Sequence, residues 1–286
     1  LLLCQGGPYS CSGSGSLGAR QNQHRPKATL MSTLNVAVVQ ADLHWEQPDL
    51  NRKLLEGYIK AALPGDIVVL PEMFTTGFSM RSAALAETIQ GDTLKWMALQ
   101  AESLNVVLCG SLIINDQDQF YNRFVWMPPD GKMMFYDKRH LFRMSEENDH
   151  YSAGTDRLLV DYQDARICPL VCYDLRFPVF SRNNESYALA IYVANWPAVR
   201  SPHWTTLLRA RAIENQSFIV GVNRIGRDGN NVDYCGDSMV IDFQGNTLLD
   251  MGETPGLKRV TLDLASLAAY RSAFPAWKDN DAFIIS

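Results

Sequence analysis

The sequence lacks the features that would place the chain in a membrane or outside the cell. No apolar run approaches the roughly 20 residues that are needed to span a bilayer. The six cysteines have no paired spacing, and four of them lie in apolar or strand-like surroundings, so they do not read as a disulfide framework. We therefore expect no membrane association and a reducing, cytoplasmic location.

Features typical of metal, nucleotide and nucleic-acid binding are also missing. The five histidines show no H-x-x-x-H or comparable ligand spacing, and residues 226–231 (GRDGNN) are interpreted as a turn rather than a phosphate loop. The formal net charge is -5 and there is no basic stripe, which argues against nucleic acid as a partner. We expect neither a metal nor a cofactor.

The chain divides into a short N-terminal part and one long domain. Residues 1–30 are rich in Gly, Ser and Gln, have almost no hydrophobic periodicity and carry no secretory signal. We interpret them as a disordered or foreign extension, with an organellar transit peptide as the alternative. Residues 31–286 are expected to form one domain with a C-terminal tail, and 286 residues with 47% hydrophobic content suffice for a large core.

Hydrophobic patterning in this domain predicts more strands than one sheet readily holds. Short strands that alternate with helices favour layered α/β packing. Two sheets packed face to face and covered outside by helices accommodate the strands, which predicts an α/β fold, a four-layer αββα sandwich. The expected strands are 35–40, 66–71, 105–113, 121–127, 132–137, 157–161, 166–172, 189–194, 218–224, 236–243 and 258–263, and the expected helices are 49–62, 92–103, 179–185, 203–216 and 265–273.

A cysteine at the end of a predicted strand is the strongest functional signal. The apolar run 167–172 (ICPLVC) ends at Cys172, and a polar pair and Pro178 follow, where a first helical turn is expected. At such a strand-to-helix elbow, free backbone N–H groups stabilise a thiolate or an oxyanion. A buried core cysteine is the alternative for an isolated residue, but two other segments favour a nucleophile.

Two further strands end on residues that suit catalysis. The buried run 66–71 ends just before Glu72, and the strand 132–137 ends just before Lys138. In an open α/β sheet, chemistry gathers beyond the carboxyl ends of the strands. Glu72, Lys138 and Cys172 are therefore expected to meet in one site.

The segments that carry these residues resemble a known family. LPEMF, YDKRHLF and CYDLRFP are similar to motifs of the nitrilase superfamily of carbon–nitrogen hydrolases, and the likeness runs from about Asn35 to about Asp263. Residues 141–144 (LFRM), 194–197 (ANWP) and 209–216 (RARAIENQ) are most similar to bacterial omega-amidases. The resemblance implies an αββα sandwich that hydrolyses the terminal amide of α-keto acid monoamides, such as α-ketoglutaramate and α-ketosuccinamate, to the dicarboxylate and ammonia.

The resemblance, together with the demands of amide hydrolysis, gives each catalytic residue an expected role. Cys172, with a lowered pKa, would attack the carbonyl and form a thioester. Glu72 would take the thiol proton, pass it to the leaving ammonia and then activate water. Lys138 and the backbone N–H of Tyr173 would hold the oxyanion.

A second glutamate is expected to hold the lysine and position water. Glu147, in the segment ENDHYSAG, fits the family pattern. If the segment is shifted by one residue against the family pattern, its neighbour Glu146 takes this role. For both residues, the alternative is a place in an acidic surface loop.

The substrate carboxylate calls for a cation at a fixed reach from the nucleophile. Arg200 is our first choice and Arg176 the second, although Arg176 also suits a structural role that braces the elbow; Arg143 is a third option. Phe78 and Trp196 are expected to wall the pocket around a short carbon chain, and each fits a plain core role equally well.

Other functions fit the sequence less well. An N-carbamoyl-amine or N-carbamoyl-amino acid hydrolase is the main alternative, followed by a true nitrilase. A catalytically silent binding protein of the same fold would have no reason to keep Glu72, Lys138, Glu147 and Cys172 together. A cysteine–histidine pair would require His140 or His203 to reach the thiol. The expected partners are a small keto-acid amide and a second copy of the chain in a homodimer.

Overall fold

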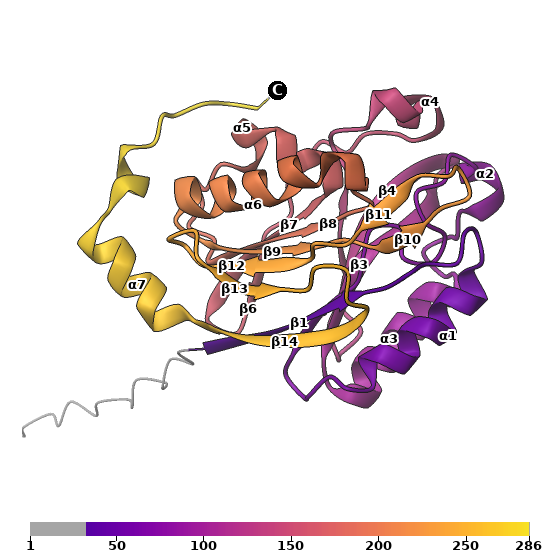
Figure 1. The fold of residues 1–286 in the computed structure, drawn as a ribbon, viewed down its shortest axis with the longest axis horizontal. Helices are drawn as coiled ribbons and strands as arrows, with labels where there is room; N and C mark the ends of the chain where they lie inside the picture. The colour runs from indigo at the N-terminus through magenta and orange to yellow at the C-terminus, as the bar shows by residue number, and fades with distance from the viewer. Residues whose placement is uncertain (1–32, 286) are drawn as a thin grey trace, which may run out of the picture. The chain divides into compact units, whose positions relative to one another are not determined.

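The computed structural model describes residues 33–285, so the prediction for the extension 1–30 lies outside the described residues. The described chain forms two six-stranded sheets, with helices on their outer faces (Figure 1). This is the αββα arrangement that the patterning predicted. No helix in the described part of the chain is long and apolar enough to cross a membrane.

The first sheet has the strand order β14-β1-β2-β3-β4-β5. Its centre is parallel, since β1 pairs with β2 and β2 with β3 in the same direction, while β14, β4 and β5 are antiparallel to their neighbours. The bounds are β1 (Thr33–Gln40), β2 (Ile67–Val69), β3 (Val107–Asp116), β4 (Gln119–Met127), β5 (Met134–Asp137) and β14 (Gly256–Asp263).

The second sheet has the order β13-β12-β9-β8-β7-β6, and its central strands β7, β8 and β9 are parallel. A separate hairpin, β10 with β11, follows β9 in the chain. The bounds are β6 (Val160–Tyr162), β7 (Ala165–Val171), β8 (Leu189–Val193), β9 (Phe218–Val222), β10 (Ile225–Arg227), β11 (Asp233–Cys235), β12 (Met239–Ile241) and β13 (Thr247–Asp250).

Alternation of side chains along the strands explains why the sheets are buried on both faces. In β1, Val36 and Val38 belong to the core cluster that the two sheets share, whereas Ala37 and Val39 belong to the cluster beneath the outer helices. All four side chains are fully buried. A strand with apolar residues on both faces fits between two other layers, which agrees with the sandwich predicted from the number of strands.

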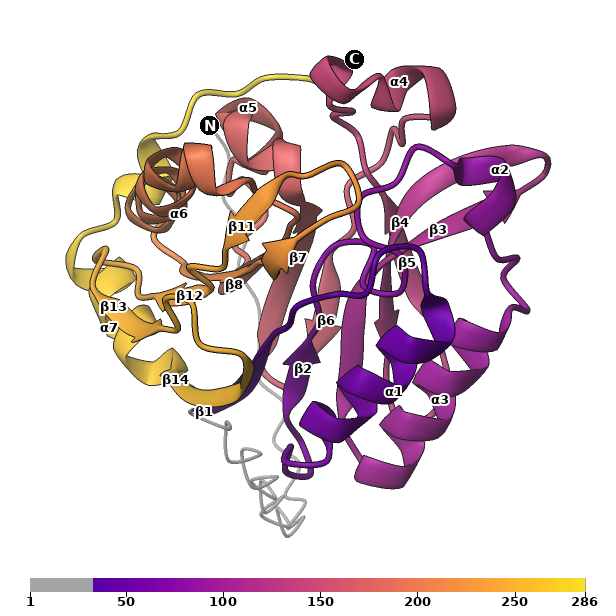
Figure 2. The same ribbon diagram turned by 45° about the vertical axis from the view of Figure 1, so that its right-hand side comes forward.

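The helices cover the outer faces. Figure 2 shows α1 (Pro48–Ile59) and α3 (Asp92–Leu104) together over the first sheet, and α6 (Ser201–Asn215) over the second. Gly221 in β9 lets α6 approach closely, because a Cβ there would run into Leu208 and Trp204. Shorter elements are α2 (Ser82–Leu85), α4 (Glu147–His150), α5 (Pro178–Ser181), α7 (Leu264–Ala273), and the 3₁₀ turns η1 (Arg143–Ser145), η2 (Cys172–Arg176), η3 (Ala198–Arg200) and η4 (Ala276–Asp279).

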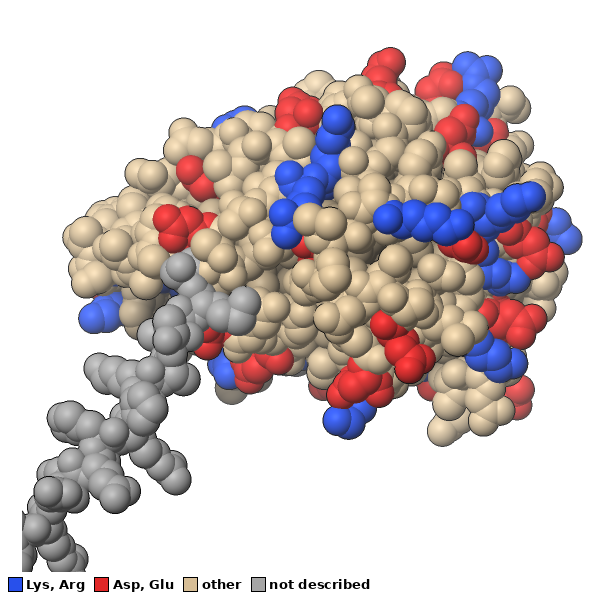
Figure 3. Space-filling view, turned by 90° about the horizontal axis from the view of Figure 1, so that it is seen from below, with Lys and Arg blue, Asp and Glu red and all other residues tan. Residues whose placement is uncertain are grey.

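Several small elements were missing from the sequence prediction. The strands β10, β11 and β13 and the short helices α2 and α4 were not expected, and the strand predicted at 236–243 covers only Met239–Ile241. Part of the predicted turn 226–231 belongs to β10, so this segment is the arm and tip of a hairpin. On the face seen in Figure 3, acidic and basic side chains lie interspersed.

Candidate active site

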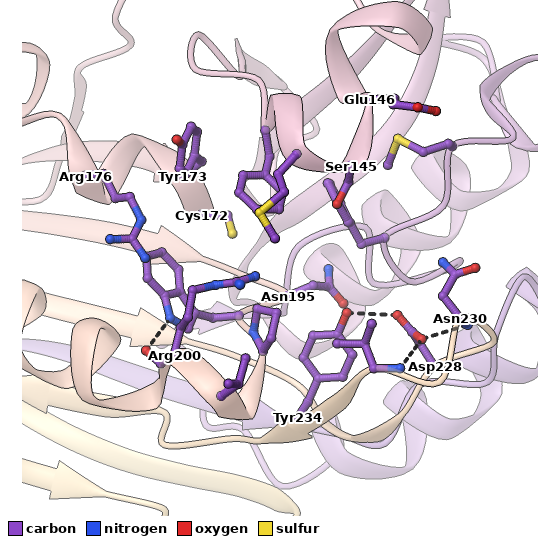
Figure 4. Close-up of a pocket in the computed structure, with 18 of the residues that line it drawn as sticks. Ser145, Glu146, Cys172, Tyr173, Arg176, Asn195, Arg200, Asp228, Asn230 and Tyr234 are labelled. Carbon is purple, nitrogen blue, oxygen red and sulfur yellow. Dashed lines mark hydrogen bonds between the residues drawn. The ribbon is translucent and has the colours of Figure 1, made fainter.

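Cys172 lies at a sharp elbow between β7 and the turn η2. Its φ is 44°, in the left-handed region, which costs a residue with a Cβ about 1–3 kcal/mol and persists only where the surroundings fix it. The side chain is half-buried, and its sulfur faces a cavity (Figure 4). The local fold therefore exposes the Cys172 sulfur to the cavity, as a nucleophile requires.

Asp174 fixes this elbow to the end of β5. Its buried carboxylate accepts four hydrogen bonds: from the Val171 backbone N–H (2.9 Å), the Tyr136 hydroxyl (2.8 Å), the His140 backbone N–H (3.1 Å) and His140 Nδ1 (2.7 Å). Three of these donors belong to Tyr136 and His140, which flank Lys138 in sequence, and the fourth belongs to Val171, which precedes Cys172. One carboxylate thus holds the lysine segment and the cysteine segment in a fixed relation.

Glu72 lies beyond the carboxyl end of β2 and is fully buried. Its Oε2 accepts the backbone N–H of Asn195 (2.8 Å), and its Oε1 accepts Asn122 Nδ2 (2.7 Å) and Lys138 Nζ (2.9 Å). Asn195 also donates its side-chain amide to the Glu72 carbonyl (2.7 Å). Because both sheets contribute donors, the carboxylate is fixed in position between them.

Lys138 bridges the two buried glutamates. Its Nζ lies 3.0 Å from both carboxylate oxygens of Glu147 and 2.9 Å from Glu72 Oε1. Burial alone would lower the pKa of Lys138, but the charges of Glu147 and Glu72 outweigh it and raise the pKa. The pKa of Glu147 is raised by burial, which Lys138 opposes. The ammonium is therefore charged, and it cannot act as a base.

Glu147, and not Glu146, is the glutamate that meets the lysine. Glu147 is fully buried, and its Oε2 also accepts the backbone N–H of Phe142 (2.6 Å). Glu146 is exposed at the cavity rim with a φ of 58°. Because the backbone turns here, between η1 and α4, the Glu146 side chain points to solvent and the Glu147 side chain points into the protein.

The expected low pKa of Cys172 is wrong. Burial raises the pKa of the thiol well above its ordinary value, the negative charge of Glu72 adds to this, and Lys138 opposes it only in part. These surroundings favour the neutral thiol over the thiolate, and Glu72 is near enough for its charge to contribute to this.

The cavity in front of Cys172 has a volume of about 510 Å³. The five residues selected from the sequence for substrate binding all line it: Phe78, Tyr173, Arg176, Trp196 and Arg200. Arg143 does not; it lines a separate depression with Arg139 and His140. The Cys–His alternative has no support, because His140 pairs with Asp174 and His203 Nδ1 lies 3.0 Å from Arg176 Nη2.

The two arginines of the cavity differ in their surroundings. The Arg176 guanidinium lies 4.8 Å from the Trp196 ring and contacts His203, so it is partly engaged in structure. The Arg200 guanidinium lies 5.5 Å from the Phe142 ring, and its side chain makes no hydrogen bond to any of residues 33–285. The Arg200 carbonyl accepts the indole N–H of Trp196 (2.8 Å), which places Trp196 in the cavity wall.

The sequence did not identify Asn122, Asn195 or Asp174 as site residues. Asn122 sits inside β4, and its amide joins Glu72 to Glu147, at 2.7 Å and 3.3 Å. The available signal was polarity: Asn122 and Asn195 are amides within or directly after strongly apolar strands. Among the described residues, no group of three or more His, Cys, Asp or Glu side chains is arranged to hold a metal ion.

A half-buried thiol beside a buried carboxylate and lysine, on a sandwich of two helix-covered sheets, defines a hydrolase of the cysteine-dependent class. The sequence profile of the carbon-nitrogen hydrolase family matches residues 35–272. The chain belongs to this family, within the nitrilase superfamily, and it is a hydrolase that acts on amides.

Individual relatives cover almost the whole described chain. The omega-amidase YafV of Escherichia coli K12 is 46% identical over 255 residues, which are 88% of this chain and 99% of the relative. The 2-oxoglutaramate amidase of Bacillus subtilis is 31% identical, over 85% of this chain and 96% of the relative. A crystal structure of a carbon-nitrogen hydrolase superfamily protein from Xanthomonas campestris, with an arsenic adduct in its active site, has a TM-score of 0.88 and 42% identity over 90% of this chain and all of that one.

Proposed function

We propose that this protein is an omega-amidase, which hydrolyses the terminal amide of α-keto acid monoamides such as α-ketoglutaramate and α-ketosuccinamate to the dicarboxylate and ammonia. The observation that carries the proposal is the buried Glu72–Lys138–Glu147 cluster beside Cys172, in a cavity that also holds two arginines. The likeness to omega-amidase YafV over nearly its full length supports the substrate class.

The first half of the reaction forms a thioester. Glu72 takes the proton of the neutral Cys172 thiol as the sulfur attacks the amide carbon, so no preformed thiolate is required. The tetrahedral oxyanion is held by Lys138 Nζ and the backbone N–H of Tyr173, the first residue after the elbow. Glu72 then gives its proton to the nitrogen, the C–N bond breaks and ammonia leaves.

The second half of the reaction releases the acid. Glu72, unprotonated again, takes a proton from water as the water attacks the thioester, and the sulfur leaves with that proton. Glu147 keeps Lys138 in place through both halves, because two of the lysine's contacts are with its carboxylate oxygens, each at 3.0 Å. This role is supported by the complete burial of the pair, where water cannot substitute for a lost partner.

Arg200 is the residue that we assign to the substrate carboxylate. Within the described chain its guanidinium has no hydrogen-bonded partner, whereas Arg176 already contacts His203 and the Trp196 ring. An arginine fork fits a carboxylate in a bidentate manner. We assign Arg176 to the support of Trp196, and Phe78, whose ring lies 5.1 Å from Lys138 Nζ, to the wall beside the lysine.

We further propose that the enzyme is a homodimer in the cytoplasm. Exposed apolar side chains support a subunit contact, among them Val179 in α5 (56% exposed) and Ile213 in α6 (52% exposed). Light scattering during size-exclusion chromatography tests this proposal. A molar mass near that of one chain at micromolar concentration would contradict it.

Substrate comparison tests the proposed function. The measurement is kcat/KM for α-ketoglutaramate, glutamine, N-carbamoyl-β-alanine and a short aliphatic nitrile. We expect α-ketoglutaramate to exceed glutamine by about a thousandfold, because the α-ammonium of glutamine is attached to the same carbon as the carboxylate and would be brought next to the cation that binds it. A higher value for the carbamoyl compound would replace the omega-amidase assignment and leave family membership intact.

A further inference from the structure

The cavity is larger than the proposed substrate. α-Ketoglutaramate has about ten non-hydrogen atoms, and even at the roughly 30 Å³ that a whole water molecule takes in the liquid they would fill about 300 Å³. The cavity measures about 510 Å³, so a substantial part of it stays unused by this molecule. The inference that follows rests on the proposed function and concerns this unused part.

Cys172 divides the cavity into two sides. Figure 4 shows Tyr173, Arg176 and Arg200 on one side of the sulfur, which we call the arginine side. Asn195, Tyr234, Asp228 and Asn230 lie on the other side, which we call the hairpin side because most of it comes from β11 and the turn that joins it to β10.

The contacts of Glu72 indicate which side receives the leaving group. Glu72 must hand its proton to the departing nitrogen, and its carboxylate and carbonyl both bind Asn195, at 2.8 Å and 2.7 Å. Asn195 opens onto the hairpin side. With the carboxylate of the acyl part drawn to Arg200, the amide nitrogen points toward Asn195 and the hairpin.

The hairpin side contains one carboxylate, that of Asp228, which is bonded within the hairpin itself. The Tyr234 hydroxyl donates to Asp228 Oδ2 (2.9 Å), and Asp228 Oδ1 accepts the backbone N–H groups of Asn230 (2.8 Å) and Val232 (3.0 Å). These bonds engage the Tyr234 hydroxyl and the Asp228 carboxylate within the hairpin, and Val232 and Met80 add apolar side chains to the lining of the same cavity. Ammonia alone would leave the space beside Val232 and Met80 unfilled.

We infer that the enzyme also hydrolyses secondary ω-amides of α-keto acids, in which the nitrogen carries a short uncharged alkyl group that occupies the hairpin side. The step balances as it does for the primary amide. The Cys172 Sγ–C bond forms, the C–N bond breaks, and the amine leaves with the thiol proton delivered by Glu72. Water then supplies the hydroxyl of the acid and the proton of the thiol.

The test compares α-ketoglutaramate with its N-butyl amide, and it follows the dicarboxylate product because the second compound releases no ammonia. We expect the two kcat/KM values to lie within about tenfold of each other. Val232→Trp should fill the hairpin side and lower kcat/KM for the N-butyl amide more than about tenfold, while α-ketoglutaramate changes by less than about threefold. Its backbone contact with Asp228 is kept in this variant.

Val199→Trp is the matched control, since Val199 lines the same cavity next to Arg200 and is 82% exposed. It should change the two substrates by the same factor. Turnover of α-ketoglutaramate without turnover of the N-butyl amide would overturn this inference and leave the proposed function standing. Equal losses for both substrates in Val232→Trp would overturn the assignment of the hairpin side. Failure with α-ketoglutaramate itself would refute the proposed function instead.

Discussion

Replacing Glu147 by Gln removes one buried charge without changing the size of the side chain. Its two oxygens together face Lys138 Nζ, Asn122 Nδ2 and the Phe142 N–H, all of which are donors. The Gln amide must turn an NH₂ group toward at least one of them. Each hydrogen bond to a charged group contributes about 1.5–3 kcal/mol, so we expect a loss of about 2–3 kcal/mol in the free energy of unfolding, with Lys138 still paired to Glu72.

For a domain of this size, that loss corresponds to a fall in Tm of about 4–12 °C. Activity should fall further, because Lys138 loses the partner that aims it at the oxyanion; we expect kcat to drop by about 10²–10³. The assays are thermal unfolding by circular dichroism and steady-state turnover of α-ketoglutaramate.

Glu146→Gln is the control that makes this prediction sharp. Glu146 is adjacent in sequence and lines the same cavity, but its side chain is exposed and contacts no catalytic residue. Tm and kcat should both stay close to those of the wild type, with a stability change within about 0.5 kcal/mol. The reasoning is refuted if Glu146→Gln loses activity and Glu147→Gln keeps it, because the segment would then be out of register by one residue.

Three further predictions concern the elbow, the substrate carboxylate and the thiol. Asp174→Asn should lower kcat by a factor about 10² larger than the factor by which it raises KM, because an amide cannot accept all four hydrogen bonds that fix the cysteine and lysine segments. A variant in which only Tm changes would contradict this positioning role. Arg200→Ala should raise KM for α-ketoglutaramate by about 10–10²-fold with Cys172 still alkylatable, whereas a larger effect in Arg176→Ala would exchange the two roles. Since burial and Glu72 raise the pKa of Cys172, the thiolate fraction in free enzyme is small at neutral pH, and alkylation by iodoacetamide should accelerate about tenfold per pH unit through the alkaline range; a rate independent of pH would reveal a preformed thiolate.

Long elements with strong patterning could be predicted from the sequence. The apolar runs that became β1, β7, β8 and β9 are buried on both faces, so their length and composition alone identify central strands. The hairpin β10–β11 was missed because its Gly- and Asn-rich residues have the composition of a turn. Gly226 in β10 has a φ of 86°, and a Cβ at this position would run into the Asp42 side chain.

The candidate site residues could be proposed from the sequence because they follow strands, but the electrostatics of the site could not. Glu72, Lys138 and Cys172 each stand at a strand end, and strand ends of an α/β sheet gather in space. The direction of the Cys172 pKa depends on how deeply the thiol lies and on its proximity to Glu72, neither of which the order of residues reveals. Asn122 was not predicted, because its place between two glutamates depends on how β4 pairs with the segment after β5. In that pairing the Lys138 N–H donates to the Asn122 carbonyl (2.9 Å).

The rate of α-ketoglutaramate hydrolysis by Cys172→Ala tests the central claim most directly. The variant removes only the sulfur and should fold as the wild type does, which the far-ultraviolet circular dichroism spectrum and the Tm establish. If Cys172 is the nucleophile, no thioester forms and the release of 2-oxoglutarate falls by at least about 10⁴-fold. Release at more than about a tenth of the wild-type rate from a folded variant would contradict the account, because some other group would then attack the amide.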